Sequence, residues 1–345
     1  LFDQCAKASM FFTREWFETL SSTALEEGQS LLLVAVIDEA WVDEAGVDEA
    51  SVGKAGGDET QLLALLPLFE SGGEHWKSCS HRYTALYSLL LTEDRQGDVL
   101  NCLTEGLKQL PFQVLRLEPV ADDDDNLKKL QVALESHGFE CHRNFFFYNW
   151  YHQTRGQSFE EYMAERPAQL RNTIVRKRRK LERERDCDIR MYRGDDVEQA
   201  LNDYHAAYSS SWKAYEQYGD LLDALAINLA VPDWTRLAVL YIDGEPAAAQ
   251  LWFVVQGKAS IFRLAYDEAW KQYSPGSILT AWLMQYVIDT DGVEEIDFLT
   301  GNESYKQDWM SARRTRSRLV LGKKREAKSE PGWLRSIVKR LFGRR

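Results

Sequence analysis

The chain has 345 residues, 44% of them hydrophobic, and a formal net charge of −12. This apolar content, with 11 Trp, 15 Tyr and 15 Phe, excludes a disordered protein and is enough for two folded domains. No apolar run approaches the roughly 18 residues that a transmembrane helix requires, so none is expected. The chain opens at Leu1 and not at a methionine, which leaves a removed leader segment open.

The charge is unevenly distributed along the chain. From Ala312 to Arg345 there are 13 Lys or Arg and 2 Asp or Glu, a net +11, so the rest carries −12 − 11 = −23. Acidic residues concentrate in Asp38–Glu59 and Asp122–Asp125. We therefore expect the body of the protein to repel nucleic acids and anionic membranes, and the C-terminal segment to attract them.

Cysteine usage favours an intracellular protein. The five cysteines are Cys5, Cys79, Cys102, Cys141 and Cys187. Their number is odd and no two form a CxxC pair, which favours reduced thiols and a cytoplasmic location. No spacing of His, Cys, Asp and Glu indicates a metal site, and no histidine pairs with a serine or cysteine as a hydrolase triad requires.

The first half alternates predicted strands and helices, which indicates an α/β layer fold. The predicted strands are Ser30–Ile37, Gln61–Phe69, Gln113–Leu117 and Phe139–Phe147, and the predicted helices are Met10–Leu20, Val99–Leu110 and Asn126–His137. The first two strands suit a hairpin, and Trp41–Gly57 between them contains a short acidic duplication typical of a solvated loop. Asp122–Asp125 can cap the helix that ends at Gly138.

The second half has the same alternation. The predicted helices are Phe159–Arg166, Pro167–Glu184, Asp196–Tyr218 and Ile278–Ile288, and the predicted strands are Asp188–Tyr192, Trp234–Ile242, Ala247–Gln256, Lys258–Tyr266 and Glu295–Leu299. Asp243-Gly244 is a hairpin signal between two of these strands. We predict one domain over 1–158, a second over 159–322, and a basic linker and tail over 323–345.

A glycine-bearing turn between a strand and a helix is the main functional signal. The turn Gln272–Ser277 follows the strand that ends at Tyr266 and precedes the helix that starts at Ile278. Backbone N–H groups at a helix N-terminus can bind a phosphate. The alternative is an ordinary helix start without a ligand.

Four short runs carry a family resemblance. They are Arg166–Ile174 (RPAQLRNTI), Ala248–Trp252 (AAQLW), Ser274–Leu279 (SPGSIL) and Tyr305–Trp309 (YKQDW). With these runs the chain resembles the GNAT acyltransferase superfamily, and in particular its duplicated CelD-like branch of cellulose-biosynthesis acetyltransferases, which is related in fold to the Fem peptidyltransferases. The resemblance implies two tandem GNAT-like domains, each with a mixed, mostly antiparallel sheet flanked by helices.

The resemblance also implies a donor site. Acetyl-CoA or another acyl-CoA would lie in a splayed gap between two central strands, with its pyrophosphate at the start of the following helix. The implied contacts are Leu264, Ala265, Gln272, Ser274, Pro275, Gly276, Ser277 and Ile278. The superfamily pattern Gln/Arg-x-x-Gly-x-Gly/Ala is only partly kept, because Pro275 and Ser277 occupy the two small-residue positions and Pro275 lacks an N–H donor.

Catalytic residues follow from the same resemblance. Tyr305 lies where many superfamily members place a general acid, and a phenol with an unperturbed pKa near ~10 is protonated at pH 7. Lys306 falls where the Fem relatives carry a lysine that stabilises an oxyanion. Asp297 is a candidate base, with Asp267 and Glu268 as alternatives. The other interpretation is that Tyr305 packs at a loop, Lys306 is solvated and the carboxylates cap turns.

Two basic segments that are predicted as helices each allow two functional interpretations. Arg171–Arg185 either balances the acidic first domain or guides an anionic acceptor or CoA to the cleft. Pro331–Arg345 has an apolar face opposite Lys and Arg residues, which suits either an anionic membrane surface or the acidic domain. The linker before it, Lys323–Glu330, is expected to let the tail reach away.

The combined prediction is an acyl-CoA-dependent N- or O-acyltransferase. The acceptor would be a small molecule or saccharide with an amine or hydroxyl, such as an envelope saccharide or lipid precursor, modified at the inner face of a membrane. One alternative is a Fem-like transferase that uses aminoacyl-tRNA as donor, and another is a non-catalytic membrane-associated scaffold.

Overall fold

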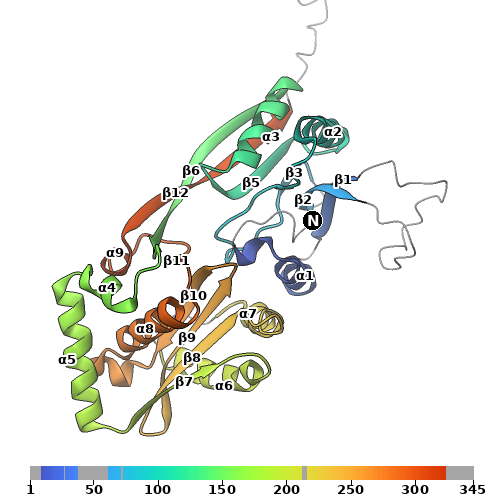
Figure 1. Cartoon of the computed structure of the whole chain (residues 1–345). Helices are drawn as coiled ribbons and strands as arrows, with labels where there is room; N and C mark the ends of the chain where they lie inside the picture. Colours follow the sequence, from blue (N-terminus) through green and yellow to red (C-terminus); the bar gives the residue numbers. More distant parts are fainter. Residues whose placement is uncertain (1–8, 27, 38–60, 71–72, 212–215, 324–345) are drawn as a thin grey trace, which may run out of the picture.

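One continuous sheet runs through the molecule (Figure 1). The computed structural model describes residues 9–26, 28–37, 61–70, 73–211 and 216–323. In these residues the sheet has 12 strands in the order β1-β2-β3-β5-β12-β6-β11-β10-β9-β8-β7, with β4 paired to β2. Most neighbours are antiparallel, and β3–β5 and β10–β11 are parallel. The predicted α/β class with a mostly antiparallel sheet is confirmed.

The element bounds are as follows. The strands are β1 (Ser30–Ile37), β2 (Leu62–Glu70), β3 (His75–Ser78), β4 (Leu90–Leu91), β5 (Val114–Ala121), β6 (Phe139–Gln153), β7 (Cys187–Tyr192), β8 (Thr235–Ile242), β9 (Glu245–Val255), β10 (Lys258–Tyr266), β11 (Glu295–Asp297) and β12 (Ala312–Lys323). The α-helices are α1 (Arg14–Thr23), α2 (Gln96–Gln109), α3 (Asp125–Ser136), α4 (Phe159–Ala164), α5 (Ala168–Glu184), α6 (Asp196–Ser209), α7 (Gly219–Asn228), α8 (Pro275–Gln285) and α9 (Lys306–Trp309). Shorter helical turns are η1 (Met10–Phe12), η3 (Glu268–Tyr273) and the π-helical η4 (Tyr286–Thr290).

The N-terminal half of the sheet follows its sequence signals closely. β1 and β2 form the predicted antiparallel pair, from Ser30↔Glu70 onward. α2 and α3 contribute Leu103 and Leu130 to a fully buried cluster with Phe112. The Asp124 side chain accepts from the Leu127 N–H at 3.2 Å and so caps α3, as predicted. The loop Trp41–Gly57 lies outside the described residues.

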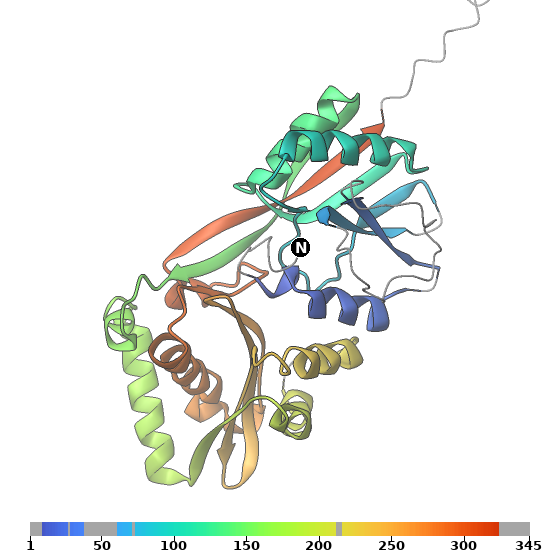
Figure 2. The same cartoon turned by 45° about the vertical axis from the view of Figure 1, so that its right-hand side comes forward.

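β12 is the largest element that the sequence analysis missed. It lies between β5 and β6, with Arg316 opposite both Ala121 and Phe147. The chain therefore returns to the N-terminal half of the sheet after completing the C-terminal half, and β6 and β12 run side by side between them (Figure 2). The domain bounds predicted from the sequence stay a prediction, and the topology adds this returning strand to the first half.

The C-terminal half is a sheet covered on both faces. α8 and α5 lie on one face and α6 and α7 on the other (Figure 1). Asp243 and Gly244 have φ values of 53° and 87°, so the predicted two-residue hairpin is confirmed. The single helix predicted over Asp196–Tyr218 is wrong, because α6 ends at Ser209 and a separate helix, α7, follows.

The two halves share a buried apolar cluster. Met10 and Trp16, in η1 and α1, are fully buried together with Leu222 and Leu225 of α7. The N-terminal helix thus packs against the C-terminal half, and this shared cluster joins the separate core of each half to the other. None of the described helices is both long and apolar enough to cross a membrane.

Candidate active site

The parallel strands β10 and β11 separate after a short ladder. Their pairing runs from Lys258↔Glu295 to Ser260↔Asp297, where β11 ends, whereas β10 continues to Tyr266. A register shift between β10 and β9 makes Phe262 the extra residue just past this point. The Phe298 N–H still donates to the Trp150 carbonyl of β6 at 2.9 Å. The chain after β11 therefore follows β6 and leaves β10, which opens a gap in the sheet.

Asp297 fixes this separation. Its Oδ1 accepts from the Leu299 N–H at 2.7 Å and from Asn149 Nδ2 at 2.5 Å. Asn149 Nδ2 also donates to the Leu299 carbonyl at 2.8 Å. Leu299 has a φ of 56°, a left-handed conformation that costs a branched residue about 1–3 kcal/mol. The two polar side chains hold this strained turn, and the turn directs the chain away from β10.

Asp297 is also the centre of a buried ion cluster. Only 2% of the residue is exposed, and Oδ2 lies 2.7 Å from Lys258 Nζ and 2.9 Å from Arg314 Nη2. The same two cations contact Glu295 at 2.9 and 2.6 Å. Burial alone would raise the pKa of Asp297, but Lys258, Arg314 and Arg316 together lower it well below its usual range.

None of the candidate bases lines the pocket at this gap. Asp297 is absent from the lining of the pocket described next, and a carboxylate held ionised by two cations is a weak proton acceptor. The geometry therefore favours a positioning role for Asp297 over the predicted role as a base. Asp267 caps η3 by accepting from the Ala269 N–H at 2.8 Å, and Glu268 lies 3.7 Å from Lys271.

A pocket of about 200 Å³ occupies the mouth of the gap. It is lined by Ile261, Phe262, Arg263 and Leu264 of β10, by Phe298, Leu299, Thr300, Glu303, Tyr305 and Lys306, and by Arg82 and Tyr83 of the N-terminal half. Of the two predicted donor contacts on β10, Leu264 lines this pocket, whereas Ala265 is 1% exposed and lies opposite Ala249 of β9.

Tyr305 lies at the rim of this pocket. It remains 42% exposed, and its ring packs edge-to-face on Phe298 with centroids 5.8 Å apart. Partial burial, with a smaller contribution from Glu303, raises the pKa of Tyr305 to about 12. The phenol therefore stays protonated at neutral pH, as a general acid must be before it donates.

Lys306 is buried and not solvated. It is 4% exposed, and its Nζ donates to the carbonyls of Phe298, at 3.3 Å, and Thr300. The third contact is an ion pair with Glu303 at 2.9 Å. Gly301 makes this arrangement possible, because its φ is 105° and a Cβ there would lie 2.5 Å from a Glu303 oxygen. Lys306 thus closes the loop after β11 and places a cation at the gap.

The first turn of α8 contains the predicted phosphate site. The helix starts at Pro275, earlier than predicted, and follows Ser274 in a left-handed conformation with φ 55°. The N–H groups of Ser277 and Ile278 both donate to the Ser274 carbonyl, at 3.1 and 3.2 Å. For the Gly276 N–H, no acceptor occurs in the part of the chain that the structure describes. This amide is the donor left for an anion.

Gln250 fixes that turn to the sheet. Its Nε2 donates to the Gly276 carbonyl at 3.0 Å and to Thr280 Oγ1 at 2.8 Å, and its Oε1 accepts from Trp252 Nε1 at 2.9 Å. A Cβ on Gly276 would lie 3.2 Å from the Tyr266 ring, closer than most real contacts. The run AAQLW and the SPG turn, distant in sequence, are therefore parts of one local structure.

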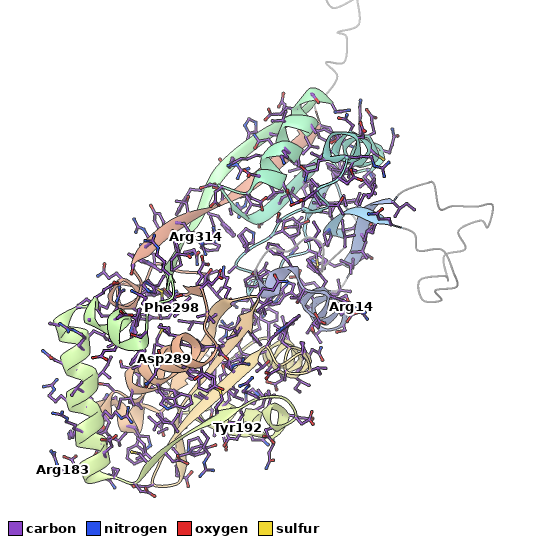
Figure 3. The ribbon with its side chains drawn as sticks, viewed as in Figure 1. Arg14, Arg183, Tyr192, Asp289, Phe298 and Arg314 are labelled. Atoms are coloured by element: carbon purple, nitrogen blue, oxygen red, sulfur yellow. The ribbon has the colours of Figure 1, made fainter. Side chains whose placement is uncertain are left out.

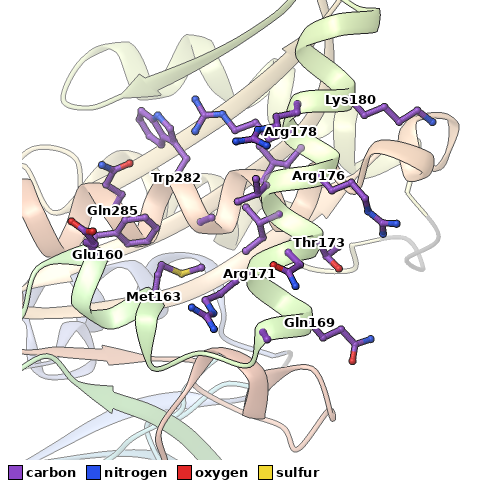
Figure 4. Close-up of a pocket in the computed structure, with 18 of the residues that line it drawn as sticks. Glu160, Met163, Gln169, Arg171, Thr173, Arg176, Arg178, Lys180, Trp282 and Gln285 are labelled. Atoms are coloured by element: carbon purple, nitrogen blue, oxygen red, sulfur yellow. The ribbon is translucent and has the colours of Figure 1, made fainter.

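The basic helix α5 lies beside the same turn. Lys177 Nζ donates to the Gln272 carbonyl at 2.5 Å. In Figure 4, Arg171 and Arg178 lie on the side of α5 that faces Trp282 of α8, and Arg176 and Lys180 lie on the other side. Several ion pairs of α5 are local, such as Arg178–Glu182 at 2.8 Å and Lys180–Glu184 at 3.9 Å. These pairs compensate part of the charge of α5 within the helix itself, whereas Lys177 contributes its charge beside the turn that precedes α8.

Some residues of the pocket could not be found from the sequence. Arg82, Tyr83 and Arg263 form one wall of the pocket, where the Arg263 guanidinium lies 3.8 Å from the centre of the Tyr83 ring. No local pattern marks residues that meet only through tertiary packing. No group of three or more His, Cys, Asp or Glu that could hold a metal occurs in the described residues, and Cys79, Cys102, Cys141 and Cys187 are free thiols.

Comparisons with known proteins identify the domain type. Residues 168–307 match the family model of the acetyltransferase (GNAT) domain. No curated protein matches the sequence. The crystal structure of FemX is similar over 92% of this chain and 94% of its own, with 8% identity and a TM-score of 0.61.

Two further structures share the fold. One is the C-terminal domain (DUF2156) of a putative lysylphosphatidylglycerol synthetase from Agrobacterium fabrum, with 12% identity over 75% of this chain and 81% of that domain, TM-score 0.51. The other is a conserved protein of unknown function from Bacteroides thetaiotaomicron, with 13% identity over 75% and 83%, TM-score 0.53. These likenesses show the fold alone. The predicted GNAT-type domain is confirmed.

Proposed function

We propose that this chain is an acyltransferase that takes an acyl group, most simply acetyl, from acyl-CoA and transfers it to an amine or hydroxyl. The observation that carries the proposal is the gap between β10 and β11, which leads along β10 to the first turn of α8. The pantetheine arm would enter the gap past Leu264, and the pyrophosphate would meet the Gly276 amide. The nearby Lys177 adds positive charge on that side.

The reaction needs one acid and one group that stabilises negative charge. The acceptor attacks the thioester carbonyl, a tetrahedral oxyanion forms, and the C–S bond breaks as Tyr305 donates its proton to the leaving thiolate. Lys306 would stabilise the oxyanion, which requires it to exchange its contact with Glu303 for one with substrate. The base that accepts the acceptor's proton is not assigned to a residue.

The pocket wall formed by Arg82, Tyr83 and Arg263 suits an acceptor that carries polar or anionic groups. Arg82 and Arg263 both line the pocket, and Arg263 is held 3.3 Å from Glu216. An envelope saccharide or lipid precursor fits this wall. A basic tail at Pro331–Arg345, which lies outside the described residues, would then hold the enzyme at an anionic membrane on its cytoplasmic side.

Calorimetric titration of acetyl-CoA into the full chain tests the donor. Gly276→Glu places a carboxylate in the phosphate site and should weaken binding by more than about tenfold. Gly97→Glu is the matched control, because Gly97 is also the second residue of its helix and a Cβ added there would have no other atom within 4 Å. Absence of binding to the wild type, or equal loss in both variants, would overturn the proposal.

Aminoacyl-tRNA is the second candidate donor. Its support is the basic face of α5 and a fold shared with FemX over 92% of this chain. A tRNA that co-purifies with the wild type, and is lost when Arg176–Lys180 are neutralised, would favour it.

A non-catalytic scaffold predicts instead that Tyr305→Phe leaves function intact while deletion of Pro331–Arg345 abolishes it. That deletion should also release the acyltransferase from anionic liposomes.

A further inference from the structure

A second pocket lies at the junction of the two halves. It has a volume of about 470 Å³ and lies where the ends of β5 and β6 meet the starts of β10, β11 and α3 and the first half of β12. Arg314, one of its lining residues, is labelled in this region in Figure 3. It shares no lining residue with the pocket of Tyr305 and Lys306. It is therefore a separate candidate site.

Arg316 forms the floor of this pocket and is incompletely bonded. The residue is 3% exposed, and Nη2 donates to Asn149 Oδ1 at 3.2 Å. Its Nε is buried without a hydrogen-bond partner in the described part of the chain, and no carboxylate there forms an ion pair with it. Arg314, two residues earlier, is by contrast bonded to Glu295, Asp297 and Asn149.

The buried carboxylates beneath the pocket are engaged by other groups. Glu295 and Asp297 pair with Lys258 and Arg314, and Asp124, the other buried carboxylate of the lining, accepts from the Leu127 N–H as the cap of α3. A buried cation without a counter-ion is costly, which favours an oxyanion beside Arg316. Burial, and then the neighbouring Arg314, lower the pKa of Arg316, and the carboxylates of Asp297, Asp123 and Glu295 offset only part of this effect.

The mouth of the pocket has the opposite charge. The exposed carboxylates of Asp123, Asp125 and Glu294 surround it. Polyanions such as nucleotides would be repelled at this mouth, whereas an ammonium group would be attracted. Phe12 and Leu86 supply an apolar wall. Cationic floor, acidic mouth and apolar wall together match a molecule with a carboxylate, an ammonium and an apolar side chain.

We propose that the junction pocket binds a free apolar amino acid, with its carboxylate on Arg316 and its ammonium group at Asp123 and its neighbours. The volume suits such a ligand, since small-molecule sites start at about 300 Å³. Whichever donor the acyltransferase uses, this pocket would recognise a zwitterion at a site separate from the pocket of Tyr305 and Lys306.

Titration calorimetry with three related probes tests this on the full chain. The probes are L-leucine, 4-methylpentanoate, which lacks the amine, and 3-methylbutylamine, which lacks the carboxylate. L-Leucine should bind saturably, and each of the other two at least about tenfold more weakly, since each lacks one of the two charge-assisted contacts. Equal binding of leucine and 4-methylpentanoate, tighter binding of inorganic phosphate, or no leucine binding would overturn the proposal.

Two variants assign the contacts. Arg316→Met should abolish leucine binding, whereas Arg313→Met, on the same strand but outside the pocket lining, should leave it unchanged. Asp123→Asn is exposed and serves if Arg316→Met does not fold. It should weaken leucine at least about threefold and leave 4-methylpentanoate unaffected or tighter. Leucine binding that survives both Arg316→Met and Asp123→Asn would place the ligand elsewhere and sink the assignment.

Discussion

Replacing Asp297 with asparagine isolates the charge of the buried cluster while keeping the shape of the side chain. Oδ1 can still accept from the Leu299 N–H, so the turn after β11 has its acceptor. The other oxygen becomes an NH₂ group that faces Lys258 Nζ and Arg314 Nη2, formerly at 2.7 and 2.9 Å. Two buried cations are then left with Glu295 as their remaining carboxylate partner.

The expected loss of stability follows from this change. Breaking a buried ion pair by removing one partner costs about 3–5 kcal/mol. Because Glu295 still contacts both cations, we expect the lower end, about 3 kcal/mol at pH 7. Urea denaturation followed by tryptophan fluorescence measures it. Glu18→Gln is the control, since its pair with Arg14 is 2.6 Å long but 59–70% exposed, so that water screens it and its loss should leave the free energy of unfolding nearly unchanged.

The same comparison has a defined dependence on pH. The pKa of Asp297 in the folded protein lies far below its value in the unfolded chain, about 3.9. The unfolded chain therefore binds the proton first, so the contribution of Asp297 is complete above pH ~4 and is lost as the pH falls further. The difference in free energy of unfolding between wild type and Asp297→Asn should be constant from pH 5 to 8 and should become smaller below pH 5. A difference under about 1 kcal/mol at pH 7, or one that increases in acid, would refute the reasoning.

Two further predictions concern single positions. Gly301→Ala should lower the free energy of unfolding by at least about 1 kcal/mol and displace Glu303 from Lys306. The reason is that Gly301 has a φ of 105° and that the new Cβ would overlap the Glu303 carboxylate. Gly106→Ala, in open space on α2, is the control and should be neutral or stabilising in the same urea assay. Cys102 is exposed and should react with a thiol reagent in the native protein, whereas Cys79, whose burial raises its pKa to about 12, should react only on unfolding. Equal rates for Cys102→Ser and Cys79→Ser variants would contradict this.

Local signals predicted the parts of the fold that depend on neighbours in sequence. The α3 cap at Asp124 and the hairpin turn at Asp243-Gly244 are fixed within short segments, and the pairing of β1 with β2 joins two strands that are consecutive along the chain. The end of α6 at Ser209 was missed because apolar and aromatic residues continue in the sequence from there to Tyr218.

The site was predicted less completely because it is assembled from distant segments. The hydrogen bond from Asn149 to Asp297 joins residues 148 apart, and its effect is to turn one loop away from β10. Tyr305 and Lys306 were found through their family resemblance, and the structure places them at the same pocket. Asp297 was identified as chemically important, but its sequence could not tell a buried counter-ion from a base. That distinction depends on Lys258 and Arg314 across the sheet.

β12 was missed because its charge pattern looked like part of a solvated basic tail. Arg314, Arg316 and Arg318 alternate along it, yet Arg316 is 3% exposed and Leu319 and Leu321 are fully buried. Arginines counted as tail charge are in fact partners of Glu118, Glu295 and Asp297. Part of the +11 assigned to the C-terminal segment is thus neutralised inside the sheet, and a smaller part is left for a membrane.

The position of β12 between β5 and β6 predicts that the N-terminal half does not fold without this strand. A fragment of residues 28–153 contains β1 to β6 but lacks the strand between β5 and β6, so both would have unpaired inner edges. We expect it to be insoluble or to unfold without a cooperative urea transition. Joining Gln153 to the segment Ala312–Lys323 through a short glycine-containing turn should restore a soluble, cooperative fold, because Tyr151 and Ala312 are already opposite each other. Cooperative folding of the fragment without β12 would show that the N-terminal half does not need the returning strand.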